Sequence, residues 1–151
     1  MEQLDKQKLL QKCKYLVQYK LEDTQRMIDE IRVASADDTK STAGDKHETG
    51  RAMSHLEIEK LQSVMASLSG QAQTLENINP SRLTNQLELG AIVETSGGVF
   101  FLSAPLGRLE LDGQEVWAIG MHAPLIKTLE QALKSGDGVF NGKTYRIARV
   151  Y

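Results

Sequence analysis

The sequence has one cysteine, few aromatic residues and almost no net charge, and each scarcity excludes some classes of protein. Because Cys13 is the only cysteine, the chain can form neither an internal disulfide nor a cysteine-based zinc cluster. We expect Cys13 to be a small apolar residue, buried or half-buried on a helix. The formal net charge of -2 at pH 7 disfavours a protein that binds nucleic acid by neutralising phosphates. A protein partner is therefore favoured.

Long apolar runs are also missing from the start of the chain. The segment MEQLDKQKLLQKCKYL alternates charged with apolar side chains, so we expect neither a signal peptide nor a membrane span there. The 40% hydrophobic and 25% charged content is ordinary for a soluble globular protein that buries a core. We expect a cytoplasmic protein that makes no contact with a membrane.

Apolar residues at helical spacing fill two stretches of the first half. They recur every three or four positions between residues 9 and 31, and again between residues 58 and 75. Two helices with matching stripes and a short polar break predict an antiparallel coiled-coil hairpin over residues 1–78, with its tip at 34–51. With roughly 28 residues in each arm, the hairpin is on the order of 40 Å long. The stripe comprises Leu10, Val17, Leu21, Ile28 and Ile31, with Lys14 and Thr24 on the same line, and then Ile58, Leu61, Met65, Leu68, Ala72 and Leu75.

A second domain begins after Asn79-Pro80, which stops the second helix. We place a linker at 79–85 and the second domain at 86–151, where the apolar spacing changes from helical to alternating. The predicted fold class is α+β, with the helical hairpin followed by a small antiparallel sheet and one helix on its face. The sheet is predicted from three hairpin turns at Gly97-Gly98, Asp112-Gly113 and Asn141-Gly142, and the helix from Pro124 near its start and Gly136 just past its end.

The aromatic residues of the second domain alternate with polar residues on the predicted strands. Trp117, the only tryptophan, is one of them. Aromatic residues in this pattern are typical of a packed, half-buried sheet surface. We therefore expect Trp117 to pack in the core rather than to line a ligand pocket.

The polar break between the helices contains a carboxylate pair. In AGDKHETGRA, residues 43–52, Asp45 and Glu48 are three residues apart. An aspartate that begins a helix, followed three residues later by a glutamate, is a variant of the capping box. A carboxylate pair at the end of a long hairpin is also suited to reach a metal ion in another molecule. Asp37 and Asp38 form a second acidic candidate, and both interpretations stay open.

These features together resemble the Gre family of bacterial transcript-cleavage factors, and the resemblance covers the whole chain. Members have an N-terminal coiled-coil hairpin, a Gly-Asp-x-x-Glu element at its tip and a small FKBP-like β domain. Residues 44–48, GDKHE, match the tip element, and Pro124, Lys127, Gly136 and Asp137 are similar to the family's motif around the helix of the β domain. Three departures are visible. Ile126 stands where a glycine is usual, and the spacing from the helix to Gly136-Asp137 is one residue longer than in the family. SADDTKSTA lengthens the tip, so the alignment of the acidic pair is not unique.

The resemblance implies a transcription elongation factor that is not itself an enzyme. Its hairpin would enter the secondary channel of RNA polymerase, where Asp45 and Glu48 would hold a second Mg²⁺ jointly with the polymerase. Asp37 and Asp38 are the alternative pair. The polymerase's own nuclease activity would then cleave the backtracked transcript, while the factor alone would bind no cofactor and cleave nothing.

The resemblance also implies the partners. These are RNA polymerase and, indirectly within the complex, nascent RNA, and we expect the factor itself to be a monomer. Met121, His122 and Pro124, just before the helix of the second domain, are the candidates for docking on the polymerase.

Three other functions are alternatives to this one. A Gre-related regulator could occupy the same channel without supporting cleavage. A coiled-coil protein of another class could form a homodimer through its hairpin and bind an unrelated partner through its β domain. The FKBP-like fold suggests prolyl isomerase activity, but fold alone does not imply function, and 5% aromatic content is little material for a proline pocket.

Overall fold

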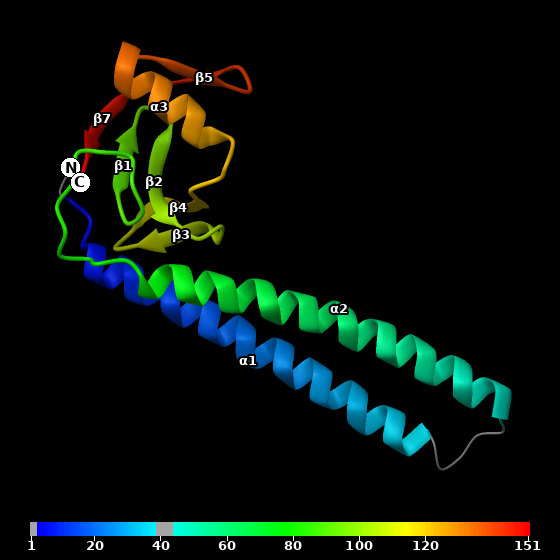
Figure 1. Cartoon of the computed structure of the whole chain (residues 1–151). Helices are drawn as coiled ribbons and strands as arrows, with labels where there is room; N and C mark the ends of the chain where they lie inside the picture. Colours follow the sequence, from blue (N-terminus) through cyan, green and yellow to red (C-terminus); the bar gives the residue numbers. More distant parts are fainter. Residues whose placement is uncertain (1–2, 39–43) are drawn as a thin grey trace. The chain divides into compact units, whose positions relative to one another are not determined.

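The computed structural model describes residues 3–38 and 44–151, with side chains for 3–36 and 48–151, and is shown in Figure 1. This part of the chain is α+β, with two long helices followed by a mostly antiparallel sheet and one further helix. It divides into two compact units. One unit joins the residues up to Lys14 to Gln73–Tyr151, and the other is Tyr15–Ala72. The division falls within both long helices. The start of the first helix and the end of the second therefore belong to the same unit as the sheet.

The two long helices are α1, Lys6–Asp38, and α2, Gly44–Glu76. Burial along them follows the predicted apolar stripe. In the unit Tyr15–Ala72 the exposed fraction is 1% for Val17, 2% for Ile28 and 7% for Leu68. Other predicted stripe positions, Leu21, Ile31, Ile58, Leu61 and Met65, are half-buried. The predicted apolar stripe is therefore confirmed, because its positions are buried or half-buried along both helices.

The main sheet has five strands in the order β3-β4-β2-β1-β7. Its strands are β1 Ile92–Thr95, β2 Gly98–Ser103, β3 Gly107–Leu111, β4 Gln114–Gly120 and β7 Ile147–Val150. A separate two-stranded ribbon is formed by β5, Gly138–Phe140, and β6, Lys143–Tyr145. The prediction of an all-antiparallel sheet is wrong at one pair, because β2 and β4 are parallel. β3 pairs with the far edge of β4 rather than with β2, so β4 runs in the same direction as β2.

Two of the three predicted hairpin turns are confirmed. Asp112-Gly113 has φ angles of 51° and 78°, and Asn141-Gly142 has 48° and 78°, the positive values that a type I′ turn requires. The first turn is displaced by one residue from the prediction. Thr95 pairs with Gly98, so the turn is Ser96-Gly97 and Gly98 begins β2.

The third helix, α3, is Leu125–Ser135, with Pro124 immediately before it and Gly136, at φ 98°, immediately after it. This confirms the predicted helix. It lies over the sheet in Figure 1 and packs its apolar face into the core. That core is made of Ala91, Val93, Phe100, Leu102, Leu125, Ile126, Leu129 and Tyr145.

Trp117 does not pack in this core, so that prediction is wrong. Its side chain is 39% exposed, and its Nε1 donates a hydrogen bond to Glu115 Oε1 at 2.9 Å. Val116 and Ala118 are the buried residues of β4. Since successive side chains on a strand point to opposite faces, Trp117 shares the outer face with Glu115.

Candidate functional site

The predicted acidic residues lie where α1 ends and α2 begins. Asp37 and Asp38 are the last two residues of α1, whereas Asp45 and Glu48 are the second and fifth of α2. The side chain of Glu48 is exposed. The side chains of Asp37, Asp38 and Asp45 lie outside the described residues, so the grouping of the carboxylates stays a prediction.

The start of α2 bears on the two interpretations of Asp45 and Glu48. A capping box needs the aspartate at the residue before the helix. Here the helix begins at Gly44, and Asp45 is already within its first turn. Positions three residues apart on a helix are neighbours on its surface. The backbone thus gives the pair a common side of the helix without requiring the capping role.

A groove of about 550 Å³ lies close to this end of the helices. Both helices line it, and all of its residues belong to the unit Tyr15–Ala72. The Ser35 hydroxyl oxygen is buried there and has no hydrogen-bond partner within the described part of the chain. The lining comprises Arg32, Ser35 and Ala36 of α1 and Arg51, Ser54, His55, Ile58, Glu59 and Gln62 of α2.

Cationic side chains predominate in this groove. Arg32 and Arg51 are opposed by one carboxylate, Glu59. Arg32 Nη1 is 3.9 Å from Asp29 Oδ1, a long, exposed ion pair that contributes little. Guanidinium groups offer forked donors that match phosphate or carboxylate oxygens. The groove is therefore chemically suited to an anion, and no sequence pattern nominated it, since its residues come from two helices whose register the sequence does not state.

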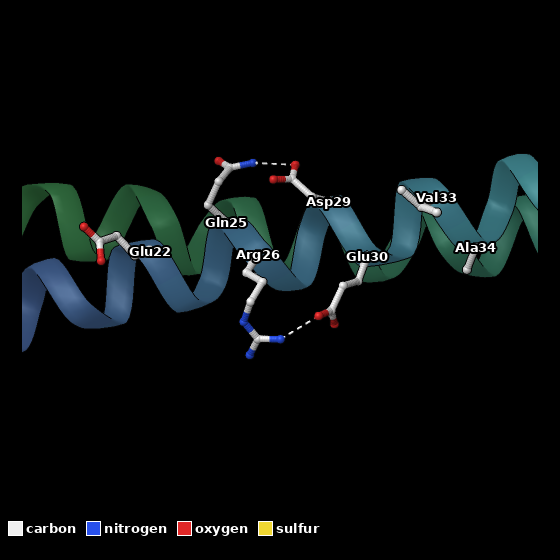
Figure 2. Close-up of a pocket in the computed structure, with 7 residues that line it drawn as sticks. All are labelled: Glu22, Gln25, Arg26, Asp29, Glu30, Val33 and Ala34. Carbon is white, nitrogen blue, oxygen red and sulfur yellow. Dashed lines mark hydrogen bonds and ion pairs between the residues drawn. The ribbon is translucent and has the colours of Figure 1, made fainter.

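A second hollow lies on α1 alone and is shown in Figure 2. Its side chains bond to one another along the helix. Gln25 Nε2 donates to Asp29 Oδ1 at 3.0 Å, and Arg26 donates to Glu30 Oε1 at 2.6 Å. Hydrogen bonds from Arg26 to Asp23 and to Glu30 raise the pKa of Arg26. Because one helix supplies every wall and its polar side chains already bond to one another, we assign no ligand to this surface.

A buried polar network joins β1 and β7 to the start of the chain. Glu94 accepts hydrogen bonds from Arg149 Nε at 2.9 Å, from Arg149 Nη2 at 2.8 Å and from the Tyr151 hydroxyl at 3.0 Å. The Leu4 amide donates to the Tyr151 hydroxyl at 2.8 Å. Burial opposes ionisation of Glu94, but the bonds from Arg149 and Tyr151 outweigh it and lower the pKa of Glu94. Burial, reinforced by Glu94, raises the pKa of Tyr151. The network is a structural tether.

The three docking candidates lie between β4 and α3. Met121 is half-buried and packs against the core. His122 and Pro124 are exposed, and Pro124 directly precedes α3. The structure therefore leaves two of the three side chains accessible, and their role in docking stays a prediction.

Among the residues that the structure describes, no group of three or more His, Cys, Asp or Glu side chains is arranged to hold a metal ion. None of the helices in that part of the chain is both long enough and apolar enough to cross a membrane.

Comparison with known proteins adds no relative. No family model, curated protein or solved structure matches the chain.

Proposed function

We propose that this protein is a Gre-type transcription elongation factor that acts on bacterial RNA polymerase in the cytoplasm. The observation that supports it best is the order of the elements. Two helices of 33 residues each meet at four acidic positions, Asp37, Asp38, Asp45 and Glu48, and a small sheet domain with one helix follows. In this proposal the sheet domain is FKBP-like, and the helices are an antiparallel coiled coil that enters the secondary channel.

Burial supports the pairing of the helices in the proposed coiled coil. Protected positions recur every three or four residues on each helix, as at Leu21, Thr24 and Ile28 of α1. Residues of α1 and α2 also line one groove. A regular stripe of this kind on two neighbouring helices is the pattern of coiled-coil packing.

The proposed role of the tip is to supply carboxylate oxygens to a Mg²⁺ ion shared with the polymerase. Magnesium takes oxygen ligands and keeps several waters, so one or two carboxylates from outside are enough. Asp45 and Glu48, three residues apart in the first turns of α2, fit this donor set. When bound, a second metal ion supports phosphodiester hydrolysis by activating water and stabilising the leaving oxygen. The chain's own part is to position the two carboxylates, and it cleaves nothing alone.

The cationic groove gives the proposal a contact with nascent RNA. Arg32, Arg51 and His55 line it near the tip. Arginine side chains bind phosphate oxygens through paired hydrogen bonds and neutralise the phosphate charge. This local basic surface is compatible with the chain's net charge of -2, because the groove contains only one carboxylate, Glu59, and the other acidic residues that the structure describes lie outside it.

A transcript-cleavage assay tests the proposal. RNA polymerase is stalled in a backtracked complex with 3′-labelled RNA and Mg²⁺, and the factor is added. We expect the wild type to release short 3′ fragments, and Asp45→Asn and Glu48→Gln to bind the polymerase but to lose this stimulation. Asp37→Asn and Asp38→Asn test the alternative pair. Glu57→Gln, at an exposed glutamate further along α2, is the matched control and should behave like the wild type.

The other outcomes are equally informative. If the wild type binds yet suppresses elongation, and the tip variants do the same, the protein is a regulator that occupies the channel without supporting cleavage. Loss of cleavage only in the Asp37 and Asp38 variants moves the metal-binding role to that pair. If neither the wild type nor any variant binds the polymerase, the Gre-type proposal is wrong.

A further inference from the structure

A small polar pocket lies in the unit that contains the sheet, where the first turn of α1 meets the segment between α2 and β1. Its volume is about 260 Å³. The groups that matter for its chemistry are Lys6, Asn77, Asn79, Arg82, Thr84 and Glu88. Neither the tip carboxylates nor the cationic groove belongs to it, so the proposed polymerase function leaves it unused.

Lys6 is the unusual residue of this pocket. It is only 9% exposed, although lysine ammonium groups are almost always in solvent. Its Nζ donates to the backbone carbonyl of Arg82 at 3.0 Å. An ammonium has three donors, and among the residues that the structure describes this carbonyl is their only hydrogen-bond acceptor. Burial lowers the pKa of Lys6, with the nearby Glu88 opposing the change.

The other charges in the pocket compensate one another. Arg82 Nε donates to Glu88 Oε1 at 2.7 Å, and Arg82 Nη2 approaches Glu88 Oε2 at 3.5 Å. Hydrogen bonds from Arg82 and Thr84 lower the pKa of Glu88, which is therefore ionised near neutral pH. With this pair neutralised, the Lys6 charge is left over, and the lining has a net charge of one positive unit.

The amide of Asn79 adds donors to this charge. Its Oδ1 already accepts a hydrogen bond from the Ser81 amide at 3.0 Å. The Oδ1 atom of Asn79 is thus already hydrogen-bonded, and its NH₂ group is the part of the side chain that can donate to a ligand. Ammonium and amide donors around a polar hollow favour a ligand with negatively charged oxygens. A volume below the 300–1,000 Å³ of typical ligand pockets limits that ligand to a few heavy atoms.

We propose that this pocket binds a small organic monocarboxylate through the Lys6 ammonium and the Asn79 amide. A single negative charge matches the single positive charge of the lining. A dianion such as sulfate would face the Glu88 carboxylate with no second free cation to offset it. The proposal is independent of polymerase binding, because none of the residues that the proposed function uses, at the tip, in the cationic groove or just before α3, lines this pocket.

Amide chemical shifts test the proposal, with sodium acetate as the probe. The ¹⁵N-labelled full chain is titrated with acetate against sodium chloride at equal ionic strength. We expect saturable shifts of the Asn79 side-chain amide and the Gly90 backbone amide, which line the pocket. Lys6→Met should abolish saturation, whereas Lys8→Met, at an exposed lysine on the same helix, should retain it. Saturation in Lys6→Met, or equal shifts with chloride, overturns the proposal.

Acylation of the wild type decides the question if Lys6→Met does not fold. Limiting acetic anhydride is added, and the labelling rate of each lysine is read by peptide mass spectrometry. At acetate about ten times its Kd, Lys6 labelling should slow about tenfold, while Lys8 labelling stays constant. Unchanged Lys6 labelling overturns the site, and stronger protection by sulfate overturns the monocarboxylate assignment. Neither result alters the cleavage assay, so the two proposals fail separately.

Discussion

Glu94 shows at the scale of one residue how burial and charge are reconciled in this fold. It is 7% exposed and accepts three hydrogen bonds, two from Arg149 and one from Tyr151. An isolated buried carboxylate would be costly, but here every donor comes from a neighbouring strand or from the end of that strand. The same bonds link Leu4 to the sheet through Tyr151. Substitution of Glu94 therefore tests how firmly the residues before α1 are tied to the sheet.

We predict that Glu94→Gln lowers the free energy of unfolding by about 1–3 kcal/mol near neutral pH, because a charged acceptor is lost from a buried network. The folded pKa of Glu94 is lowered, so its stabilisation is present above the unfolded pKa of about 4.3 and is lost as the pH falls through the folded pKa. The difference between wild type and variant should shrink on acidification below that range. Urea unfolding at a series of pH values measures it.

The matched control for this prediction is Glu130→Gln, at an exposed glutamate of α3. It should change the unfolding free energy little at any pH, as surface substitutions usually do. A Glu94→Gln difference that stays constant from neutral pH to the acid limit would show that packing, and not the charge, is what the variant loses.

Single residues also show what the sequence could and could not predict. Cys13 is fully buried on α1, which confirms the prediction of a small, buried or half-buried apolar residue on a helix, and burial raises the pKa of its thiol to about 12. Trp117 was assigned to the wrong face, because alternation gives the period of a strand but not which half faces the core. Lys6 was missed, since a lysine near the start of a charged helix gives no sign that its ammonium is buried.

At the scale of elements, the locally encoded features were predicted. Helix spacing, the Asp112-Gly113 and Asn141-Gly142 turns and the ends of α3 all depend on neighbours in sequence. The parallel pairing of β2 with β4 depends instead on how a whole hairpin is placed, and it was missed. The candidate site divides in the same way. Its carboxylates are visible in the sequence, whereas the groove of Arg32, Arg51 and His55 requires the register of two helices.

Two glycines lie in the interior of α2, where alanine is the more favourable residue. Gly50 and Gly70 are both exposed in the helix, and a Cβ added at either meets no atom within 4 Å. Glycine in a helix interior is unfavourable by roughly 0.5–1 kcal/mol relative to alanine. We predict that Gly50→Ala and Gly70→Ala each raise the free energy of unfolding by about that amount. Chemical denaturation followed by circular dichroism measures it.

Comparison of the two glycine variants also separates an effect on stability from an effect on function. Gly50 lies close to the proposed tip, whereas Gly70 lies near the other end of the helix. If Gly50 serves close approach or local flexibility in the polymerase complex, Gly50→Ala should reduce transcript cleavage while Gly70→Ala does not. Equal cleavage by both variants would leave Gly50 without a functional role, and a loss of stability in either would contradict the open surroundings of these positions.

For the whole molecule, the two compact units differ in how much they bury. The buried side chains described in Tyr15–Ala72 are confined to Val17, Thr24, Ile28 and Leu68. The other unit contains the core beneath α3 and fully buried strand residues such as Ile92 and Phe101. Helices of limited intrinsic stability depend on tertiary packing for most of their free energy. The helical unit should therefore open more readily than the unit with the sheet.

Hydrogen exchange measured by mass spectrometry tests this difference. We predict that amides in 15–36 and 48–72 have protection factors at least about tenfold smaller than those of β1 and β2, which corresponds to an opening free energy about 1.4 kcal/mol lower. Equal protection at every protein concentration would contradict the argument from burial. Protection of the helices that rises with concentration would have another meaning. It would show that chains associate through α1 and α2, which would count against the expected monomer and favour a homodimeric coiled-coil protein over a factor that enters a polymerase channel alone.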